Sequence, residues 1–108
     1  MKNKALILDI PQLKKFDDTK RHLETIWSDK HTKINLICMK PGQTITTHTH
    51  HDNHVWIVME GEGEFMIAGE KQVIGQGKIV IVQPLVDHGI SNASKNDLVI
   101  ASFTAVGD

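Results

Sequence analysis

From Leu23 onward the chain consists of short runs of β-branched and aliphatic residues, separated by turn residues at close intervals. Runs of this kind are typical of strands in an antiparallel sandwich or barrel. Glycine, asparagine and aspartate stand between them, where tight reversals need a positive φ or a side chain that caps the turn. The pattern predicts an all-β fold with strands near residues 23–28, 32–40, 43–50, 54–60, 63–68, 71–74, 78–83, 88–92 and 97–104.

One stretch ahead of these strands has helical character. In "PQLKKFDDTKRH", residues 11–22, Leu13 and Phe16 lie three positions apart, which predicts one short N-terminal helix or turn. No repeat or low-complexity segment interrupts the 108 residues, a length typical of one compact domain. We therefore expect residues 1–108 to form a single domain that needs neither a disulfide nor a structural metal to fold.

Two of the predicted strands, "VWIVM" (55–59) and "KIVIVQ" (78–83), are apolar at nearly every position. A strand with one face in water alternates apolar and polar residues, so both faces of these strands should be covered. One face fills the interior of the barrel, and the other must lie against more protein. In so small a domain an identical subunit is the natural candidate, which predicts a homodimer.

Composition narrows the partners and the compartment. Twelve basic and thirteen acidic residues give a formal charge of -1, and no basic stripe with interleaved aromatics is present, so we expect no nucleic-acid partner. No apolar run is long enough to cross a bilayer, and the first apolar piece, broken by Asp9 and Pro11, makes a poor signal peptide. The lone Cys38 fits a reducing compartment. These features predict a cytoplasmic protein without a membrane partner.

Four of the seven histidines lie in "HTHHDNH", residues 48–54. In an extended strand His48 and His50 point the same way, while His51 points to the opposite face. His54 follows a turn-prone tripeptide, which could return its side chain to the same place from the next strand. A polar run on a surface loop is the alternative, but the H-x-H-x3-H spacing favours a site for a transition metal.

These residues fall into the first of two motifs by which the chain resembles the cupin family. That motif reads G-x5-H-x-H, then three or four residues, Glu, six residues and Gly. In residues 42–61 the glycines Gly42 and Gly61 and the first two histidines are in register, and His54 stands where the family usually has glutamate. The resemblance implies a double-stranded β-helix, also called a jelly-roll or cupin barrel.

The second cupin motif reads G-x5-P-x-G-x2-H-x3-N and corresponds to residues 77–92. Gly77, His88 and Asn92 are in register, whereas Gln83 replaces the motif proline and Leu85 the motif glycine. These two departures leave the fold prediction intact but put the shape of the turn before His88 in doubt.

Together the motifs imply one divalent transition metal ion, held by a four-histidine variant of the cupin site: His48, His50, His54 and His88. Four neutral imidazoles leave the charge of the ion uncompensated, which makes it a stronger Lewis acid than a site with one carboxylate. Imidazole suits Fe, Ni, Cu, Zn and Mn, so the sequence does not distinguish the metal. It predicts no site for an organic cofactor.

Strand parity places Trp56 and Val58 on the His54 side as an apolar wall, and Gln83 is expected at the pocket mouth. No acidic residue is predicted to point inward, and the chain has no tyrosine, which disfavours a mechanism with a strong protein base. No residue can be assigned a catalytic role. We therefore predict a metal-dependent oxygenase or dioxygenase of a small enolisable or aromatic oxygenated compound. The alternatives are a non-catalytic ligand-binding or sensing module and a Lewis-acid isomerase or lyase.

Overall fold

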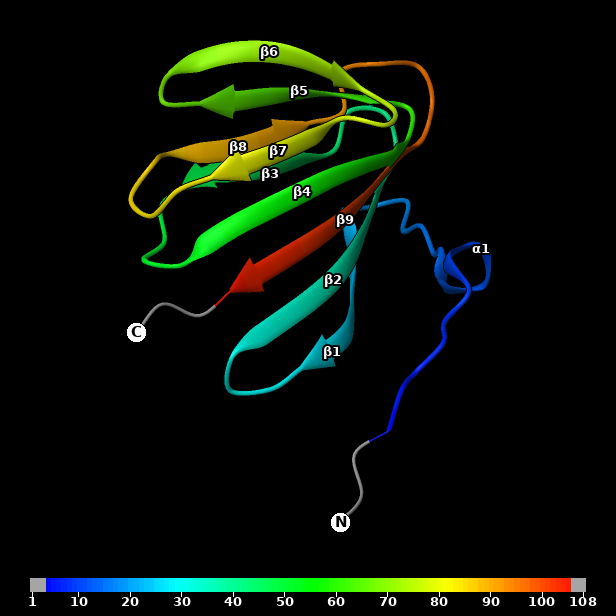
Figure 1. The fold of residues 1–108 in the computed structure, drawn as a ribbon. Helices are drawn as coiled ribbons and strands as arrows, with labels where there is room; N and C mark the ends of the chain where they lie inside the picture. The colour runs from blue at the N-terminus through cyan, green and yellow to red at the C-terminus, as the bar shows by residue number, and fades with distance from the viewer. Residues whose placement is uncertain (1–3, 106–108) are drawn as a thin grey trace.

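The structure, a computed structural model, describes residues 4–105. The chain there forms one short helix and nine strands (Figure 1): α1 (Ile10–Leu13), β1 (His22–Ser28), β2 (Thr32–Met39), β3 (Thr44–His48), β4 (Asn53–Glu60), β5 (Glu62–Ile67), β6 (Glu70–Gly75), β7 (Ile79–Val82), β8 (His88–Ser91) and β9 (Leu98–Ala105). The predicted strand positions are confirmed to within three residues at either end.

The strands form two antiparallel sheets, in the orders β1-β2-β9-β4-β7 and β3-β8-β5-β6 (Figure 1). Alternate residues from both sheets meet in one apolar core, which includes Trp56 and Leu98 from the first sheet and Phe65 and Ile90 from the second. Each of these side chains is at most 2% exposed, and burying one contributes roughly 1.5–3 kcal/mol. The all-β double-stranded β-helix with a short N-terminal helix is confirmed.

The N-terminal segment covers part of the outer face of the five-stranded sheet. Ile10, Leu13 and Phe16 pack there against a buried cluster that includes Leu36 and Val99. Helix α1 has only four residues, so most of the 11–22 stretch is not helical. One reason is that Asp17 accepts hydrogen bonds from the backbone and side chain of Thr19, a turn that competes with the helix.

The part of this outer face near the edge strand β7 is apolar and open in the single chain. Ile79 is 61% exposed and Ile81 is 68% exposed. Their neighbours across the ladder on β4 are Ile57 and Val55, which are half-buried. Within the single chain only the inner face of β7 is covered, and the cover of its outer face by an identical subunit stays a prediction.

The register of the five-stranded sheet sets the character of its inner face. Three rows of side chains cross β4, β9 and β2, and from the start of β4 inward they are His54–Thr104–Lys33, Trp56–Ser102–Asn35 and Val58–Ile100–Ile37. The first two rows carry polar side chains and the third is wholly apolar. The polar rows lie at the end of the barrel where β3 runs into β4, so the register leaves a polar hollow at that end.

Two further motif residues shape the turns at the opposite end. Gly61 has φ 76°, and a Cβ atom there would clash with the carbonyl oxygen of Asp97. The Asn92 side chain is 1% exposed and donates hydrogen bonds to the carbonyl oxygens of Met39 and Asn96, at 2.9 and 2.8 Å. Both residues therefore act in the fold. In the part of the chain that is described, no helix is long and apolar enough to span a membrane.

Candidate metal centre

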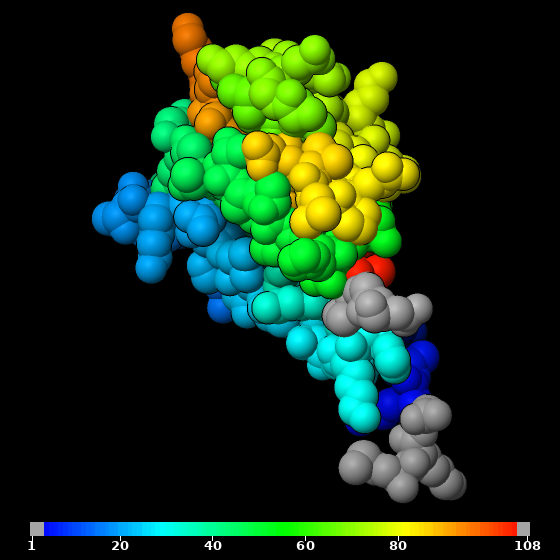
Figure 2. Space-filling view, turned by 90° about the vertical axis from the view of Figure 1, so that its left-hand side faces the viewer, coloured from blue at the N-terminus to red at the C-terminus, as the bar shows by residue number. Residues whose placement is uncertain are grey.

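Three of the predicted histidines converge from separate segments at the polar end of the barrel. His48, the last residue of β3, is paired across the ladder with His88, the first residue of β8. His50 lies beyond the end of β3, so the predicted strand through residue 50 stops two residues early. The backbone N–H of Leu85 donates to the carbonyl oxygen of His50 at 2.8 Å, which holds the β3–β4 and β7–β8 connections side by side (Figure 2).

The distances among the imidazoles are short. His48, His50 and His88 each offer one ring nitrogen, and these three atoms lie within 4.8 Å of one another. His54 is not part of that set: its ring stacks on His50, with centroids 4.5 Å apart and planes 18° apart, and lies 4.9 Å from the ring of His88. The four-histidine set is therefore not confirmed, although its fourth member adjoins the other three.

Backbone carbonyls select the nitrogen that each of two rings presents. The Nδ1 atoms of His48 and His88 lie 2.7 Å from the carbonyl oxygens of Thr46 and Val86. A carbonyl oxygen only accepts, so each Nδ1 carries the proton and donates it, and each Nε2 keeps its lone pair. Metal-bound histidines are usually oriented by such a second hydrogen bond.

Two ring nitrogens in the cluster are buried without a hydrogen-bond partner. They are Nε2 of His88, a residue that is 1% exposed, and Nδ1 of His54. An unsatisfied buried polar atom costs about 1–3 kcal/mol, so a partner that both atoms could share would stabilise the cluster. A divalent transition metal ion would supply it, because neutral imidazole is the commonest ligand for such ions. The residues present therefore fit a metal.

Burial also keeps the imidazoles in the state that binds metal. Desolvation, together with the charges of nearby histidines, lowers the pKa of His54 from 6.5 to about 4. The pKa values of His50 and His88 are lowered as well, mainly by desolvation. The hydrogen bond from His88 to Val86 opposes that shift without cancelling it. These three rings are therefore neutral at pH 7, which is the form that binds a metal.

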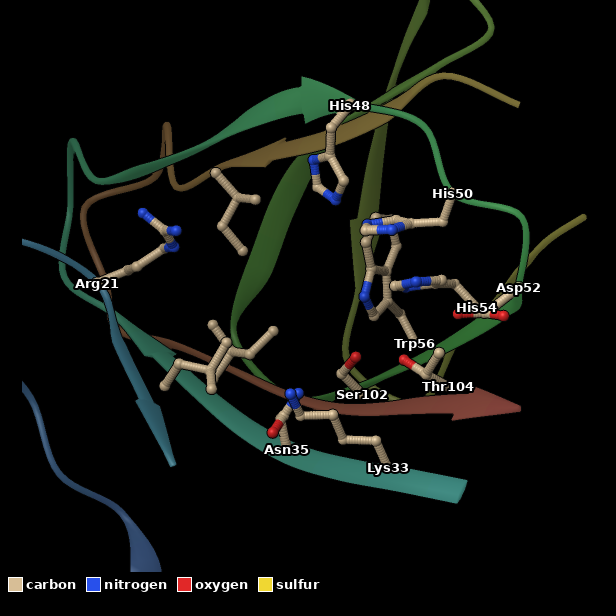
Figure 3. Close-up of a pocket in the computed structure, with 13 residues that line it drawn as sticks. Arg21, Lys33, Asn35, His48, His50, Asp52, His54, Trp56, Ser102 and Thr104 are labelled. Carbon is tan, nitrogen blue, oxygen red and sulfur yellow. The ribbon is translucent and has the colours of Figure 1, made fainter. Parts of the chain in front are cut away.

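The cluster opens into a cavity of about 330 Å³ at the end of the barrel (Figure 3). That volume is at the low end for small-molecule sites. His48, His50 and His54 line one part of the cavity. The apolar part of the wall consists of Leu23, Ile37, Ile45 and Trp56, and the polar part consists of Arg21, Lys33, Asn35, Asp52, Ser102 and Thr104. His88, which is 1% exposed, is not part of this lining.

The residues predicted for the pocket fall in different places. Trp56 lines the cavity and is 2% exposed, as an apolar wall should be. Val58 is not among the lining residues, because its side chain is 1% exposed and packs in the core. Gln83 is exposed beyond the end of β7 and does not line the cavity. His51 is exposed and outside the lining, as expected from its opposite parity.

The turn before His88 keeps the backbone shape of a glycine turn. Leu85 stands at the position of the motif glycine and has φ 68°. A left-handed conformation costs a non-glycine residue roughly 1–2 kcal/mol. The altered motif therefore keeps the shape of the turn at the cost of backbone strain at Leu85. The N–H of Leu85 still donates a hydrogen bond to the carbonyl oxygen of His50.

Sequence reasoning missed the polar part of the lining. It expected no acidic residue to point inward, yet Asp52 lines the cavity beside His54 (Figure 3). It also missed Lys33 and Asn35, which share the inner face of β2. Alternation from the buried Ile37 would have placed both of them on that face. Arg21 precedes β1 and carried no signal in the sequence.

With the geometry described, the comparisons identify the class of protein. The cupin domain family matches residues 35–104, well over half of the chain, and the protein belongs to this family. A comparison with curated proteins gave no match. The family and the fold agree, and neither assigns a reaction.

Solved structures resemble this chain over nearly its whole length. An uncharacterised protein from Klebsiella pneumoniae with a double-stranded β-helix domain is 22% identical, with a TM-score of 0.89 over 97% of this chain and 93% of that one. A protein from Thermus thermophilus is 22% identical, with a TM-score of 0.87 over 92% and 95%. KdgF from a Halomonas species is 17% identical, with a TM-score of 0.78 over 98% and 97%. At these identities the likeness shows the fold alone.

Proposed function

We propose that this cupin binds one divalent transition metal ion through His48, His50 and His88, with His54 as the fourth ligand. It would act as an oxygenase or dioxygenase on a small enolisable or aromatic oxygenated compound. The observation that carries this proposal is the convergence of three imidazole nitrogens within 4.8 Å of one another beside an open cavity. His54 would join them by turning its ring out of the stack on His50.

A bound ion would supply Lewis acidity, and with a redox-active metal it would also supply oxygen chemistry. The residues of the chain contribute binding and orientation. The carbonyls of Thr46 and Val86 hold two of the rings in place. Trp56 covers the floor of the cavity and keeps water away from the apolar part of a substrate. Several metals suit imidazole ligands, so Fe, Mn, Ni, Cu and Zn are all compatible with the donor set.

Metal stoichiometry tests the ligand set. We expect the purified protein to bind one equivalent, and His48→Ala and His88→Ala each to lose it. The exposed His51 is the matched control, and His51→Ala should keep a full equivalent at unchanged affinity. A full equivalent at unchanged affinity in either ligand variant would show that the ligand set is wrong. His54→Ala separates a three-histidine from a four-histidine site by whether its affinity falls.

Oxygen consumption tests the reaction class. Protein purified without oxygen, and reconstituted with each redox-active metal in turn, should consume oxygen with at least one member of a panel of β-diketones, catechols and flavonols. Saturable binding of panel compounds with no turnover for any metal would replace the oxygenase with a non-catalytic ligand-binding module.

Asp52 favours a second candidate, a Lewis-acid isomerase or lyase. Its carboxylate lines the cavity, and its negative charge acts on His50 and His54. A carboxylate in this position can take a proton from carbon next to a metal-bound carbonyl. Exchange of substrate protons with deuterated water in the absence of oxygen, lost in Asp52→Asn, would favour this candidate over the oxygenase.

A further inference from the structure

The wall of the cavity opposite the histidines is cationic. Arg21 lies just before β1 and Lys33 lies on β2, and both side chains line the same cavity as the imidazoles. Figure 3 shows Arg21 across the cavity from His50 and His54, with its guanidinium group directed inward. Lys33 extends from the sheet below, so the cavity has a metal-binding side and a cationic side.

We propose that Arg21 and Lys33 form an anion-binding pole that holds a carboxylate of the substrate, while oxygens at the other end of the same molecule face the histidines. The inference rests on the proposed function for the role of the histidines, and it deepens it by assigning the substrate class. That class is a small organic acid whose carboxylate is separated from a chelating pair of oxygens.

Neutral hydrogen-bond donors near the pole are positioned to donate to an anion. The hydroxyl group of Thr25 donates to Oδ1 of Asn35 at 2.9 Å, so the Nδ2 group is the part of this buried amide that remains to donate. Asn35 lines the cavity, as do Ser102 and Thr104 on the next strand. Their hydroxyls lie on the rows that connect β4 with β2, between the two sides of the cavity.

The charge balance of the lining also favours an anion. Asp52 is the only carboxylate among the described residues of the lining, and Figure 3 places that residue beside His54, on the metal-binding side. None of the ion pairs found within residues 4–105 involves Arg21 or Lys33. Two cationic side chains without such a pair at the mouth of a cavity raise the local concentration of anions.

The dimensions of the cavity set the length of the organic acid that it can bind. Lys33 lies on the same row as His54, two strands away, so their backbones are about 10 Å apart at the usual strand spacing. Both side chains reach into a cavity of about 330 Å³, which leaves room for a compound of a few bonds between its two binding groups.

A matched pair of probes tests the pole with the metal in place. Succinylacetone is a β-diketone with a carboxylate two methylene groups away, and its neutral counterpart has a methyl group instead. With cobalt-loaded protein we expect succinylacetone to bind at least about tenfold more tightly, as for one charge-assisted hydrogen bond. In the double variant Arg21→Gln, Lys33→Met this preference should fall below about threefold, with the affinity of the neutral probe unchanged.

The matched control is Lys20→Met, which removes a neighbouring exposed cation that does not line the cavity and should leave the preference intact. Raising the salt concentration should weaken succinylacetone alone, because salt screens the exposed charges. Equal affinity of the two probes for the unmodified protein, or an unchanged preference in the double variant, would overturn the anion-binding pole.

A second measurement on metal-free protein separates failure of the pole from failure of the metal site. Succinylacetone, but not its neutral counterpart, should shift the side-chain amide signals of Asn35 in NMR spectra, and the double variant should lose the shift. If these shifts occur in a protein that binds no metal, the pole holds and the proposed function fails. If metal binds at one equivalent but neither measurement shows a preference, the pole is wrong and the metal site stands.

Discussion

Mild acid should destabilise the metal-free protein, because folding holds buried histidines in the neutral state. The pKa of His54 is lowered to about 4 in the folded chain, from the ordinary histidine value of 6.5 that we expect in the unfolded chain. Between these pH values the unfolded state binds more protons than the folded state. The contribution of the neutral His54 to the free energy of unfolding is therefore fully present above pH 6.5. It decreases as the pH falls and levels off below about pH 4.

The size of the effect follows from the shift. Lowering the pKa by this amount makes the equilibrium constant for unfolding about thirty times larger at pH 5 than at pH 7.5. The loss of stability is about 2 kcal/mol. The ring of His54 is only half-buried, so solvent screening reduces its share to about 1 kcal/mol. His50 and His88 add to the loss, since their pKa values are lowered for the same reason.

Urea denaturation of chelator-treated protein at pH 7.5 and pH 5 measures this loss. Above pH 5 the surface carboxylates with lowered pKa, such as Asp29, remain ionised and do not contribute. His54→Asn should lose about 1 kcal/mol less than the unmodified protein between the two pH values. His31→Asn, in an exposed turn, is the control and should behave like the unmodified protein. Equal losses in the His54 variant and the unmodified protein would refute the reasoning.

Three further outcomes are expected. A methyl group on Gly89 would lie 2.9 Å from the carbonyl oxygen of Ile45 and would force β3 away from β8. Gly89→Ala should therefore cost about 2 kcal/mol in urea denaturation and weaken metal binding; unchanged values would contradict this. Leu85→Gly should relieve the left-handed strain and stabilise the chain by roughly 0.5 kcal/mol after the entropy cost of glycine, measured in the same way. A homodimer through the open apolar face should dissociate in Ile81→Lys, observed by sedimentation velocity, whereas a monomeric unmodified protein at micromolar concentration would remove that prediction.

The strands were predictable because their signals are local. Alternation of apolar residues and the turn residues between them act within a few positions, and the predicted positions hold to within three residues. The predicted short N-terminal helix or turn is also present, but its end was not predictable, since the side chain of Asp17 stabilises a turn that the spacing of apolar residues does not reveal. Exposure of Ile79 and Ile81 depends on what covers the sheet, and no local pattern contains that information.

The sequence by itself determined the all-β class, the cupin motifs and the histidines that meet at one end of the barrel. The histidines of the two motifs meet because strand pairing places the end of β3 opposite the start of β8. Only the tertiary structure decided that His54 stacks on His50, that Val58 packs in the core and not in the cavity wall, and that Arg21 and Lys33 face the histidines. These outcomes depend on the register between strands distant in sequence, which also decides where cationic side chains lie relative to the site.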